Sequence, residues 1–392
     1  MKNYYILSNG RVKREQNTVF VEYADGTKKP LPVEDIDSLY LYGEIDLNTK
    51  LLTFLSQKHI VLHVFNYYGF YAGSYYPREF LNSGHLLVKQ VSNYVDHTSR
   101  MAIATELVRA SAHSMLRNLA YYERRKGDAS TDADPPGEII PDAVPSTAIP
   151  TDDNAEAAID GSVDSSLSFS DIDLDADPLV ATIDLDTEIA PLTALRQTVA
   201  SLASAVGPQT DINELRGIEG KMRERYYQAW RHILSKDFLF ERRVRRPPDN
   251  EINALISFGN SVLYTVCLSE IYRTQLTPTI AYLHEPGARR FSLALDISEV
   301  FKPLIVDRAI FRLVNTGQLD KKHFDTSLDG CYLTDAGKKL FLAALEERLG
   351  STIRHRRLGR HVSYRHLIRL DCYRLIRHLT GIEPYRAFRA WW

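Results

Sequence analysis

The sequence has few cysteines and no long apolar run, and these absences exclude several classes of protein. Only three cysteines occur among 392 residues, and none forms a Cys-x-x-Cys pair. Neither a disulfide framework nor a cysteine-ligated zinc site is therefore expected. No apolar run reaches the length of about 18 residues that a membrane span needs. The opening MKNYYILSNG reads as a strand and not as the apolar core of a signal peptide. We expect a cytoplasmic protein with no membrane partner.

Positive charge is missing from one long segment. Residues 127–195 contain 17 Asp and Glu and neither Lys nor Arg. Of the 50 acidic residues in the whole chain, 33 remain outside this segment against 48 basic ones, which gives the rest of the chain a net charge of +15. The segment is rich in Asp, Ser, Pro, Ala and Thr, and it cannot bury enough apolar surface to offset its ordering entropy. We predict an acidic, disordered insertion, which is either an inert tether or a competitor of phosphates for the basic side chains.

The arginines outside the insertion are clustered. Residues 352–392 hold ten arginines against Asp371 and Glu383, and the stretch ERRVRRPPDN at 241–250 holds four more. Clustered positive charge binds polyanions because phosphate contacts release counterions. A mixed, solvated surface is the alternative interpretation. The arginines that we predict to contact nucleic acid are Arg242, Arg243, Arg245, Arg246, Arg356 and Arg357.

The hydrophobic pattern predicts an α+β fold. Residues 4–76 form short segments rich in β-branched and aromatic residues, separated by Gly, Asp and Pro. One helix, NTKLLTFLSQKH, interrupts them, with Asn48 as its N-cap. From about residue 84 onward apolar residues recur at three- and four-residue spacing. We expect an N-terminal β-sandwich-like domain over 1–83 and a mainly α-helical C-terminal domain over 84–126 and 196–392.

His284 and the two carboxylates Asp296 and Glu299 stand beside an apolar run in YLHEPGARRFSLALDISEVFKP at 282–303. Flanking prolines and a glycine place His284 in a turn between helices. Asp296 and Glu299 are three apart, on one face of the following helix. Pro303 cannot donate to the carbonyl of Glu299, so it predicts irregular geometry there. A loop histidine next to an ordinary solvated acidic face is the alternative.

A third carboxylate, Glu219, lies on or beside the apolar stripe of DINELRGIEGKMRERYYQAWRHIL. A carboxylate on the buried side of a helix needs a partner. That partner is either Arg223, one turn further on, or a divalent cation shared with His284 and Glu299. Two carboxylates and one imidazole suit Mg²⁺ or Mn²⁺, and the imidazole favours manganese.

The segments RGIEGKMRERYY, NALISFGNSVLY and TIAYLHEPGARRFSLALDISEVFKPLIVDR resemble the CRISPR-associated integrase family, the first-numbered Cas protein, which captures new spacers. The resemblance covers nearly the whole chain outside the insertion, including LSNGRVKR and FNYYGFYAGSYYPRE. The ending RHVSYRHLIRLDCYRLIRHLTGIEPYRAFRAWW resembles members of type I-B systems. The insertion itself is a departure from the family pattern.

This resemblance implies a fold, a site and a set of partners. The implied fold is an N-terminal β domain with a helical C-terminal catalytic domain, in a homodimer. The metal ligands fall on Glu219, His284 and Glu299, with Asp296 as an acidic catalytic neighbour. Lys302 is implied to hold a DNA phosphate, with an ordinary surface lysine as the alternative. Asn253 and Tyr264 are either neighbours of the active site or plain helix-packing residues. Implied partners are double-stranded DNA, the second-numbered Cas protein as a bridge between dimers, and the fourth-numbered Cas nuclease.

The sequence therefore predicts a metal-dependent DNA integrase with endonuclease activity. It would insert short foreign DNA fragments into a CRISPR array by attack of a DNA 3′-hydroxyl on a repeat phosphodiester. Two alternatives stay open at this stage. One is a structure-specific nuclease that uses the same residues with water on branched repair intermediates. The other is a catalytically silent DNA-binding subunit whose carboxylates only pair with arginines.

Overall fold

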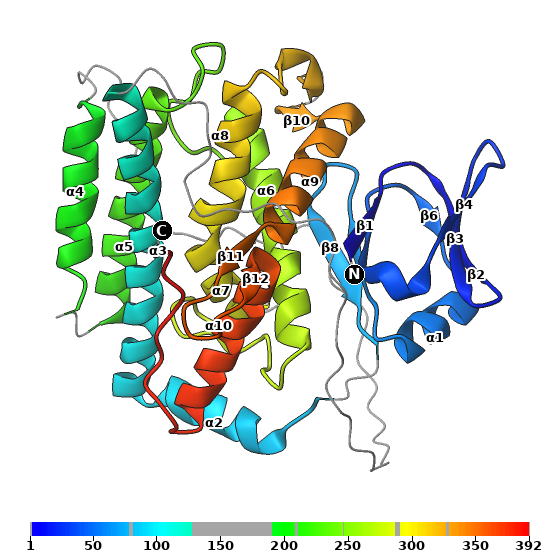
Figure 1. The fold of residues 1–392 in the computed structure, drawn as a ribbon, viewed down its shortest axis with the longest axis horizontal. Coiled ribbons are helices and arrows are strands. Elements are labelled where there is room, and N and C mark those ends of the chain that lie inside the picture. The colour runs from blue at the N-terminus through cyan, green and yellow to red at the C-terminus, as the bar shows by residue number, and fades with distance from the viewer. Residues whose placement is uncertain are drawn as a thin grey trace.

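The computed structural model describes residues 2–77, 81–127, 190–207, 211–245, 247–286, 291–326 and 329–391. The strands of the N-terminal part gather on one side of the molecule and the long helices on the other, with short strands among the helices, which confirms the predicted α+β fold (Figure 1). Most of the predicted acidic insertion, residues 128–189, lies outside the described residues. Helix α4 (Leu192–Ser204) begins four residues before the expected end of the insertion, so residues 192–195 are helical.

Two four-stranded sheets form the N-terminal part of the chain. The first has the order β1-β5-β7-β8, with β1, β5 and β7 parallel and β8 antiparallel to β7. The second has the order β4-β3-β2-β6. Their bounds are β1 (Lys2–Ile6), β2 (Gly10–Glu15), β3 (Thr18–Tyr23), β4 (Lys28–Leu31), β5 (Ile36–Leu41), β6 (Ile45–Asp46), β7 (Val61–Phe65) and β8 (Tyr71–Tyr75).

Alternating apolar residues give this part of the chain a core of its own. Val12, Val19 and Val21 of the second sheet pack in one buried cluster with Leu39 of the first. Helix α1 (Thr49–Gln57) closes the cluster with Leu51. As predicted, α1 begins after Asn48, whose side chain accepts a hydrogen bond from the N–H of Leu51 at 3.0 Å.

Helices make up the rest of the described chain. Helices α3, α4 and α5 lie side by side, and α6 runs through the middle of the helical part (Figure 1). The bounds are α2 (Gly84–Val95), α3 (His97–Gly127), α5 (Ile212–Ala229), α6 (Glu251–Tyr272), α7 (Ser292–Lys302), α8 (Arg308–Asn315), α9 (Asp335–Gly350) and α10 (Tyr364–Leu379), with a π-helical turn, η3 (Pro303–Asp307), between α7 and α8. The short elements are η1 (Val33–Asp35), η2 (Trp230–His232), η4 (Lys321–His323), β9 (Phe324–Asp325), β10 (Tyr332–Leu333), β11 (Thr352–Arg354) and β12 (His361–Ser363).

Helix α6 is buried on all sides because other elements surround it. Nearly every one of its residues is buried, including Phe258, which packs near Tyr42 of the sheet region and Phe341 of α9. Within the described part of the chain, α6 is also the one helix long and apolar enough to cross a membrane, and its apolar window is wholly buried in the protein. A helix that is apolar all round and enclosed by protein is a core helix.

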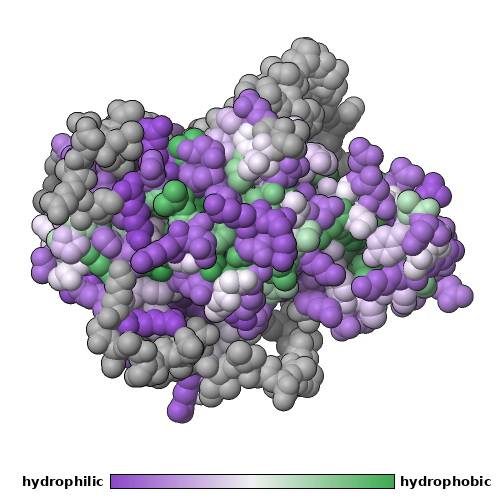
Figure 2. Space-filling view, turned by 90° about the horizontal axis from the view of Figure 1, so that it is seen from above, coloured by the Kyte–Doolittle hydropathy of each residue, from purple (hydrophilic) through white to green (hydrophobic). Residues whose placement is uncertain are grey.

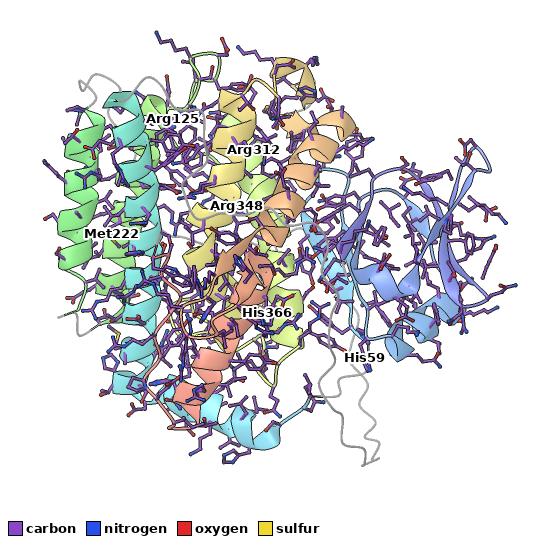
Figure 3. The ribbon with its side chains drawn as sticks, in the orientation of Figure 1. His59, Arg125, Met222, Arg312, Arg348 and His366 are labelled. Carbon is purple, nitrogen blue, oxygen red and sulfur yellow. The ribbon has the colours of Figure 1, made fainter. Side chains whose placement is uncertain are left out.

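The outer surface is mostly polar, and polar side chains also tie the helices together. Seen from above, the described part of the surface is largely hydrophilic, with smaller hydrophobic patches between (Figure 2). Arg312 of α8 forms an ion pair of 2.8 Å with Glu347 of α9. The Nε–H of Arg348 in α9 donates to the carbonyl of Leu304 at 2.9 Å (Figure 3).

A buried ionic network joins the sheet region to the helices. Asp37 of β5 pairs at 3.0 Å with Arg273, which in turn pairs at 2.8 Å with Glu270 of α6. Arg365 of α10 stands 3.6 Å from Asp37 and pairs with Glu346 of α9 at 2.7 Å. Burial alone raises the pKa of Asp37, but the charges of the nearby arginines outweigh burial and lower the pKa below its usual value. The network therefore stabilises one relative placement of the sheets and helices.

Replacing Asp37 by asparagine is expected to destabilise the protein by about 3 kcal/mol, because it leaves buried guanidinium groups without their anion. The stability that Asp37 contributes is fully present above its unfolded-state pKa of about 3.9 and is lost as the pH falls through its lower folded-state pKa. Chemical denaturation across pH 2 to 7 should therefore show a shallower acid loss for Asp37→Asn than for wild type. Asp35→Asn, at an exposed position two residues away, is the matched control. Equal stability of both variants at pH 7 would contradict this account.

Candidate active site

Glu219 faces the interior of the molecule from α5. The apolar side chains Leu215, Met222 and Tyr226 are all buried on the same helix. Glu219 shares their side and is only 4% exposed, as its position in the apolar stripe predicted. A carboxylate held there needs a positive partner, since an uncompensated buried charge is strongly unfavourable.

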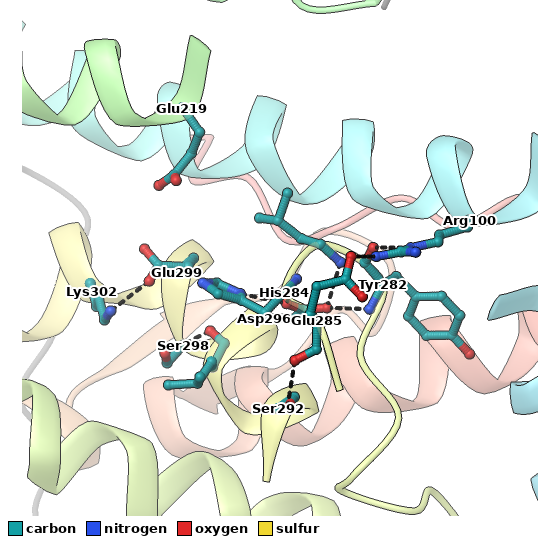
Figure 4. A network of polar contacts seen from close by, with 12 residues as sticks. Arg100, Glu219, Tyr282, His284, Glu285, Ser292, Asp296, Ser298, Glu299 and Lys302 are labelled. Carbon is teal, nitrogen blue, oxygen red and sulfur yellow. Dashed lines mark hydrogen bonds and ion pairs between the residues drawn. The ribbon is translucent and has the colours of Figure 1, made fainter. Parts of the chain in front are cut away.

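Glu299 reaches the same region from α7. It is buried, and Lys302, one turn further on, places its Nζ 2.5 Å from the Oε1 atom of Glu299. Pro303 follows directly, and the chain continues as a π-helical turn before α8, which confirms the irregular geometry expected at this proline. Figure 4 shows Glu219 pointing from α5 toward Glu299 on α7.

Asp296 holds His284 in place. Its carboxylate accepts the backbone N–H groups of Tyr282 at 2.6 Å, Leu283 at 3.0 Å and His284 at 3.0 Å. The Nδ1 atom of His284 lies 2.7 Å from the same carboxylate. A carboxylate accepts, so Nδ1 carries the proton and Nε2 is the nitrogen left for a ligand. His284 does lie between α6 and α7, as predicted. The carboxylate of Asp296 is bonded to the turn and ring of His284, so it is not available beside Glu299 for another ligand.

A second clamp fixes the same turn from the side of α3. The Nε–H of Arg100 donates to the carbonyl of Tyr282 at 3.0 Å. Arg100 also pairs with Glu285 at 2.6 Å, and Tyr94 of α2 donates its hydroxyl to Glu285 at 3.0 Å. The turn that carries His284 is thus hydrogen-bonded on both sides (Figure 4). Such support reduces the freedom of an imidazole that lies outside regular secondary structure.

Arg223 lies between the two glutamates. Its Nη2 atom is 2.9 Å from Oε1 of Glu219 and also bonds Oε2 of Glu299. The same nitrogen is 3.4 Å from the Ser111 hydroxyl on α3. The ion pair between Glu219 and Arg223, one of the two interpretations open from the sequence, is therefore present. Across the described ranges, no three His, Cys, Asp or Glu side chains lie close enough together to hold a metal ion in this arrangement.

The electrostatics of the site follow from burial and from this packing of opposite charges. Burial lowers the pKa of His284, but the hydrogen bond to Asp296 and the charges of Asp296, Glu299 and Glu219 raise it by more, so the net direction is upward. Burial raises the pKa of Glu299, but Arg223, Lys302 and His284 outweigh burial and lower it to about 2. Glu299 is therefore kept ionised by the cations that already surround it.

Three polar residues next to the site were not singled out from the sequence. Tyr226 donates its hydroxyl to Asp307 at 2.9 Å, and Asn118 of α3 donates to the Tyr226 oxygen at 2.9 Å. Burial raises the pKa of Asp307 to about 7, against the opposing effects of the Tyr226 hydrogen bond and of Arg223 and Lys302. No local sequence pattern identifies Asp307. It lies at the end of the π-helical turn, and its contact with Tyr226 of α5 is a tertiary one.

The predicted DNA-contact residues differ in their surroundings. Arg242 and Arg356 are exposed, and Arg357 is exposed although it lies 3.5 Å from Glu383. Arg245 is half-buried, and Arg246 lies outside the described residues. Arg243 is buried, and its guanidinium donates to Ser257 at 2.9 Å and to the carbonyl of Val244 at 2.6 Å. Arg243 thus stabilises its own loop. Lys302 is buried against Glu299, so the alternative of a surface lysine does not hold.

Asn253 and Tyr264 both make structural contacts. Asn253 accepts a hydrogen bond from the backbone N–H of Val244 at 3.1 Å and donates to the carbonyl of Arg242 at 2.9 Å, which anchors the loop before α6 on that helix. The Tyr264 hydroxyl accepts the N–H of Phe291 at 3.0 Å and so fixes the start of α7. These contacts match the helix-packing interpretation of both residues.

The fold and the site together define a class of protein. It is an α+β protein in which two helices and the turn before the second helix bring two carboxylates and an imidazole together below the surface, beside buried arginine and lysine. The model of the family "CRISPR associated protein Cas1" matches residues 4–143 and 178–347 of this sequence. The residues left between the two matches fall inside the acidic insertion. The chain belongs to the CRISPR-associated Cas1 family, and this confirms the resemblance drawn from the sequence.

Curated relatives and solved structures agree with this assignment. The chain is 40% identical over 392 residues to a CRISPR-associated endonuclease Cas1 of Thermodesulfovibrio yellowstonii, with 100% of both chains covered. It is 40% identical over 394 residues to the CRISPR-associated endonuclease Cas1 of Clostridium perfringens, with 100% of this chain and 99% of the relative covered. The structure of a CAS1 protein from Thermotoga maritima matches with a TM-score of 0.72 and 37% identity over 99% of this chain and 100% of that one.

Two more distant structures share the fold. A casposase bound to its integration product matches with a TM-score of 0.73 at 17% identity, over 98% of this chain and 92% of that chain. A chain from a Cas6-RT-Cas1–Cas2 complex matches with a TM-score of 0.70 at 15% identity, over 99% of this chain and 36% of that chain. The fold of this protein therefore occurs both in a CAS1 protein and in a casposase.

Proposed function

We propose that this chain is a metal-dependent DNA integrase and endonuclease that inserts short foreign DNA fragments into a CRISPR array. The observation that carries the proposal is that Glu219 and Glu299, from two separate helices, share the buried Arg223, with His284 near enough for the charges of both glutamates to raise its pKa. Two carboxylates and an imidazole are a donor set that suits Mg²⁺ or Mn²⁺, and the imidazole favours manganese. The donor chemistry fits such an ion, although Arg223 now supplies the positive charge.

Each residue of the site has a role in this proposal. Glu219 and Glu299 would hold the metal ion through carboxylate oxygens and His284 through Nε2. Asp296 accepts the Nδ1 proton, and it thereby fixes the tautomer and the ring orientation. Lys302 would bind a phosphate oxygen of the DNA. When bound, the metal ion supplies charge stabilisation of the phosphodiester and a lower pKa for the attacking hydroxyl.

The reaction class follows from the attacking group. Attack of a DNA 3′-hydroxyl on a repeat phosphodiester forms a new phosphodiester and releases the repeat's own 3′-hydroxyl, which is strand transfer. Attack by water breaks the same bond without joining, which is cleavage. Incubating the protein with Mn²⁺, a labelled duplex and a repeat-containing target should yield joined product from a 3′-hydroxyl end and none from a 3′-deoxy end. A product pattern that is the same for both ends would instead support a structure-specific nuclease.

One observation favours a second candidate, a catalytically silent DNA-binding subunit. Arg223 already pairs with both glutamates, as that candidate requires. The two candidates differ in metal binding, because a silent subunit needs no divalent ion. Calorimetric titration with Mn²⁺ separates them, since the integrase binds the ion and Glu219→Gln should abolish that binding.

The exposed arginines predict strong salt dependence of DNA binding. Each phosphate that a basic side chain neutralises contributes to the slope of log affinity against log salt concentration. The double variant Arg356→Glu and Arg357→Glu should weaken binding to all duplex sequences alike and make the slope shallower by about 2. Fluorescence anisotropy over a salt series measures both quantities.

Lys50→Glu is the control for this prediction, since it changes charge at an exposed position on α1, in the sheet region. Its affinity should stay close to that of wild type. An unchanged slope for the arginine variant would contradict a DNA contact at β11–β12. Arg243 is left out of the proposed DNA surface because its guanidinium is buried in its own loop.

The proposed partners are double-stranded DNA, a second copy of the chain and other Cas proteins. One distant structural neighbour is solved in a complex with Cas2, and we take Cas2 as the protein that bridges two dimers here. The Cas4 nuclease, which would trim the incoming fragment, is a further proposed partner. The three cysteines are all unpaired and buried, which is compatible with the reducing cytoplasm where such an assembly would work.

A further inference from the structure

Arg223 occupies the position between the two carboxylates that the proposed metal ion would need. Its Nη2 atom contacts the Oε1 atom of Glu219 and the Oε2 atom of Glu299, so one nitrogen links both proposed ligands. Lys302 contacts the other oxygen of Glu299, Oε1. The side chain of Arg223 is only 10% exposed. Of the two cations, Arg223 is therefore the one that stands between Glu219 and Glu299.

The charge balance of the site makes Arg223 and a divalent ion alternatives. Glu219 and Glu299 carry two negative charges, and Arg223 and Lys302 carry two positive ones. The four side chains are thus neutral as a group while they are buried. Adding a divalent ion without moving either cation would leave an excess of two positive charges on these groups. The nearby Asp296 carboxylate is already engaged by four hydrogen-bond donors, so such an excess is unfavourable in a buried site.

Arg223 also has a contact that involves neither glutamate. It is a long side chain on α5, and the same Nη2 atom has a neutral contact, the Ser111 hydroxyl on α3, at 3.4 Å. A guanidinium released from two carboxylates is well suited to bind a phosphate, because its planar fork matches phosphate oxygens. A phosphodiester of bound DNA would bring such a phosphate to this site.

We propose that Arg223 is a built-in substitute for the metal ion. It keeps Glu219 and Glu299 paired and the site assembled while no metal is bound, and a divalent ion must displace its guanidinium from between them. This inference rests on the proposed metal-dependent function. It assigns Arg223 a positioning role: the guanidinium raises the stability of the metal-free protein and lowers its affinity for the metal ion.

The test compares Arg223→Gln with wild type in the full-length protein. In EDTA the melting temperature of Arg223→Gln should fall by roughly 5 °C, because two buried carboxylates lose their shared cation. In Mn²⁺ titrations followed by electron paramagnetic resonance, the same variant should bind the ion about tenfold more tightly, since no guanidinium has to be displaced. The part of the Mn²⁺ binding signal that disappears in Glu219→Gln is the part that belongs to this site.

Arg225→Gln is the matched control, because Arg225 is exposed on the same helix and contacts Gln228. It should change neither quantity. Equal Mn²⁺ affinity of Arg223→Gln and wild type would overturn the inference and leave the metal site standing. Absence of Mn²⁺ binding in both would overturn the proposed function and the inference together. Should Arg223→Gln fail to fold, Arg223→Met also removes the charge and keeps an unbranched apolar stem, and an Mn²⁺ affinity no tighter than that of wild type would equally overturn the inference.

Discussion

Replacing Glu219 by glutamine is expected to reduce Mn²⁺-dependent strand transfer by at least about 100-fold, because the lost charge removes stabilisation that such sites concentrate in the transition state. The amide keeps the size of the side chain, and Arg223 retains Glu299 as its partner. The fold should therefore survive. His284→Ala and Glu299→Gln are expected to cause losses of the same order. A gel assay of joined product under single-turnover conditions measures all three.

Glu214→Gln is the matched control for these variants, because Glu214 is an exposed glutamate on the same helix. Its strand-transfer rate should equal that of wild type. Circular dichroism and melting curves check that the site variants are folded. Near-normal strand transfer by folded His284→Ala would show that the proposed set of three ligands is wrong.

Asp296→Asn is expected to reduce strand transfer and Mn²⁺ affinity by about 10- to 100-fold, the range found when a group that orients a metal ligand is changed. Asp296 accepts three backbone N–H groups and the ring of His284. An asparagine has one acceptor oxygen, and its NH₂ group would face donors. The imidazole would then lose its fixed tautomer and its orientation toward Glu299.

Ser298→Ala controls for changes in the packing of α7, since the Ser298 hydroxyl donates to the carbonyl of Leu295 on the same helix. Its effect on Mn²⁺ affinity should be small. Asp296→Asn should show a clear loss of Mn²⁺ affinity. Its melting temperature should still lie well above the assay temperature, so that the variant is fully folded when it is measured. Full metal affinity in folded Asp296→Asn would remove Asp296 from the account of the site.

The sequence predicted those features that depend on local pattern. Asn48 capped its helix because the position before an apolar-periodic segment favours a side-chain acceptor. Pro303 broke the regular helix because it lacks the N–H that would bond Glu299. The buried side of Glu219 followed from its place among apolar residues at helical spacing. The resemblance to a known family, and not the spacing, connected Glu219 with His284 and Glu299.

Features that depend on tertiary contacts could not be predicted. The i, i+4 spacing suggested that Arg223 pairs with Glu219, but its second bond to Glu299 requires α5 and α7 to meet. Arg243 looked like its neighbours in the basic run, and only the packing of its loop against α6 buries it. Asp296 and Glu299 share a helical face, yet the turn at 282–284 folds back onto Asp296 and separates their roles.

The most direct test of the central claim is anomalous X-ray scattering at the manganese absorption edge from crystals of the full-length protein grown with Mn²⁺. We predict a manganese peak in contact with Glu219, Glu299 and the Nε2 atom of His284, with the Arg223 guanidinium no longer between the two glutamates. Crystals of Glu219→Gln should lack the peak. Protein that is active in strand transfer but carries its manganese elsewhere, with Arg223 still bound to both glutamates, would contradict the account.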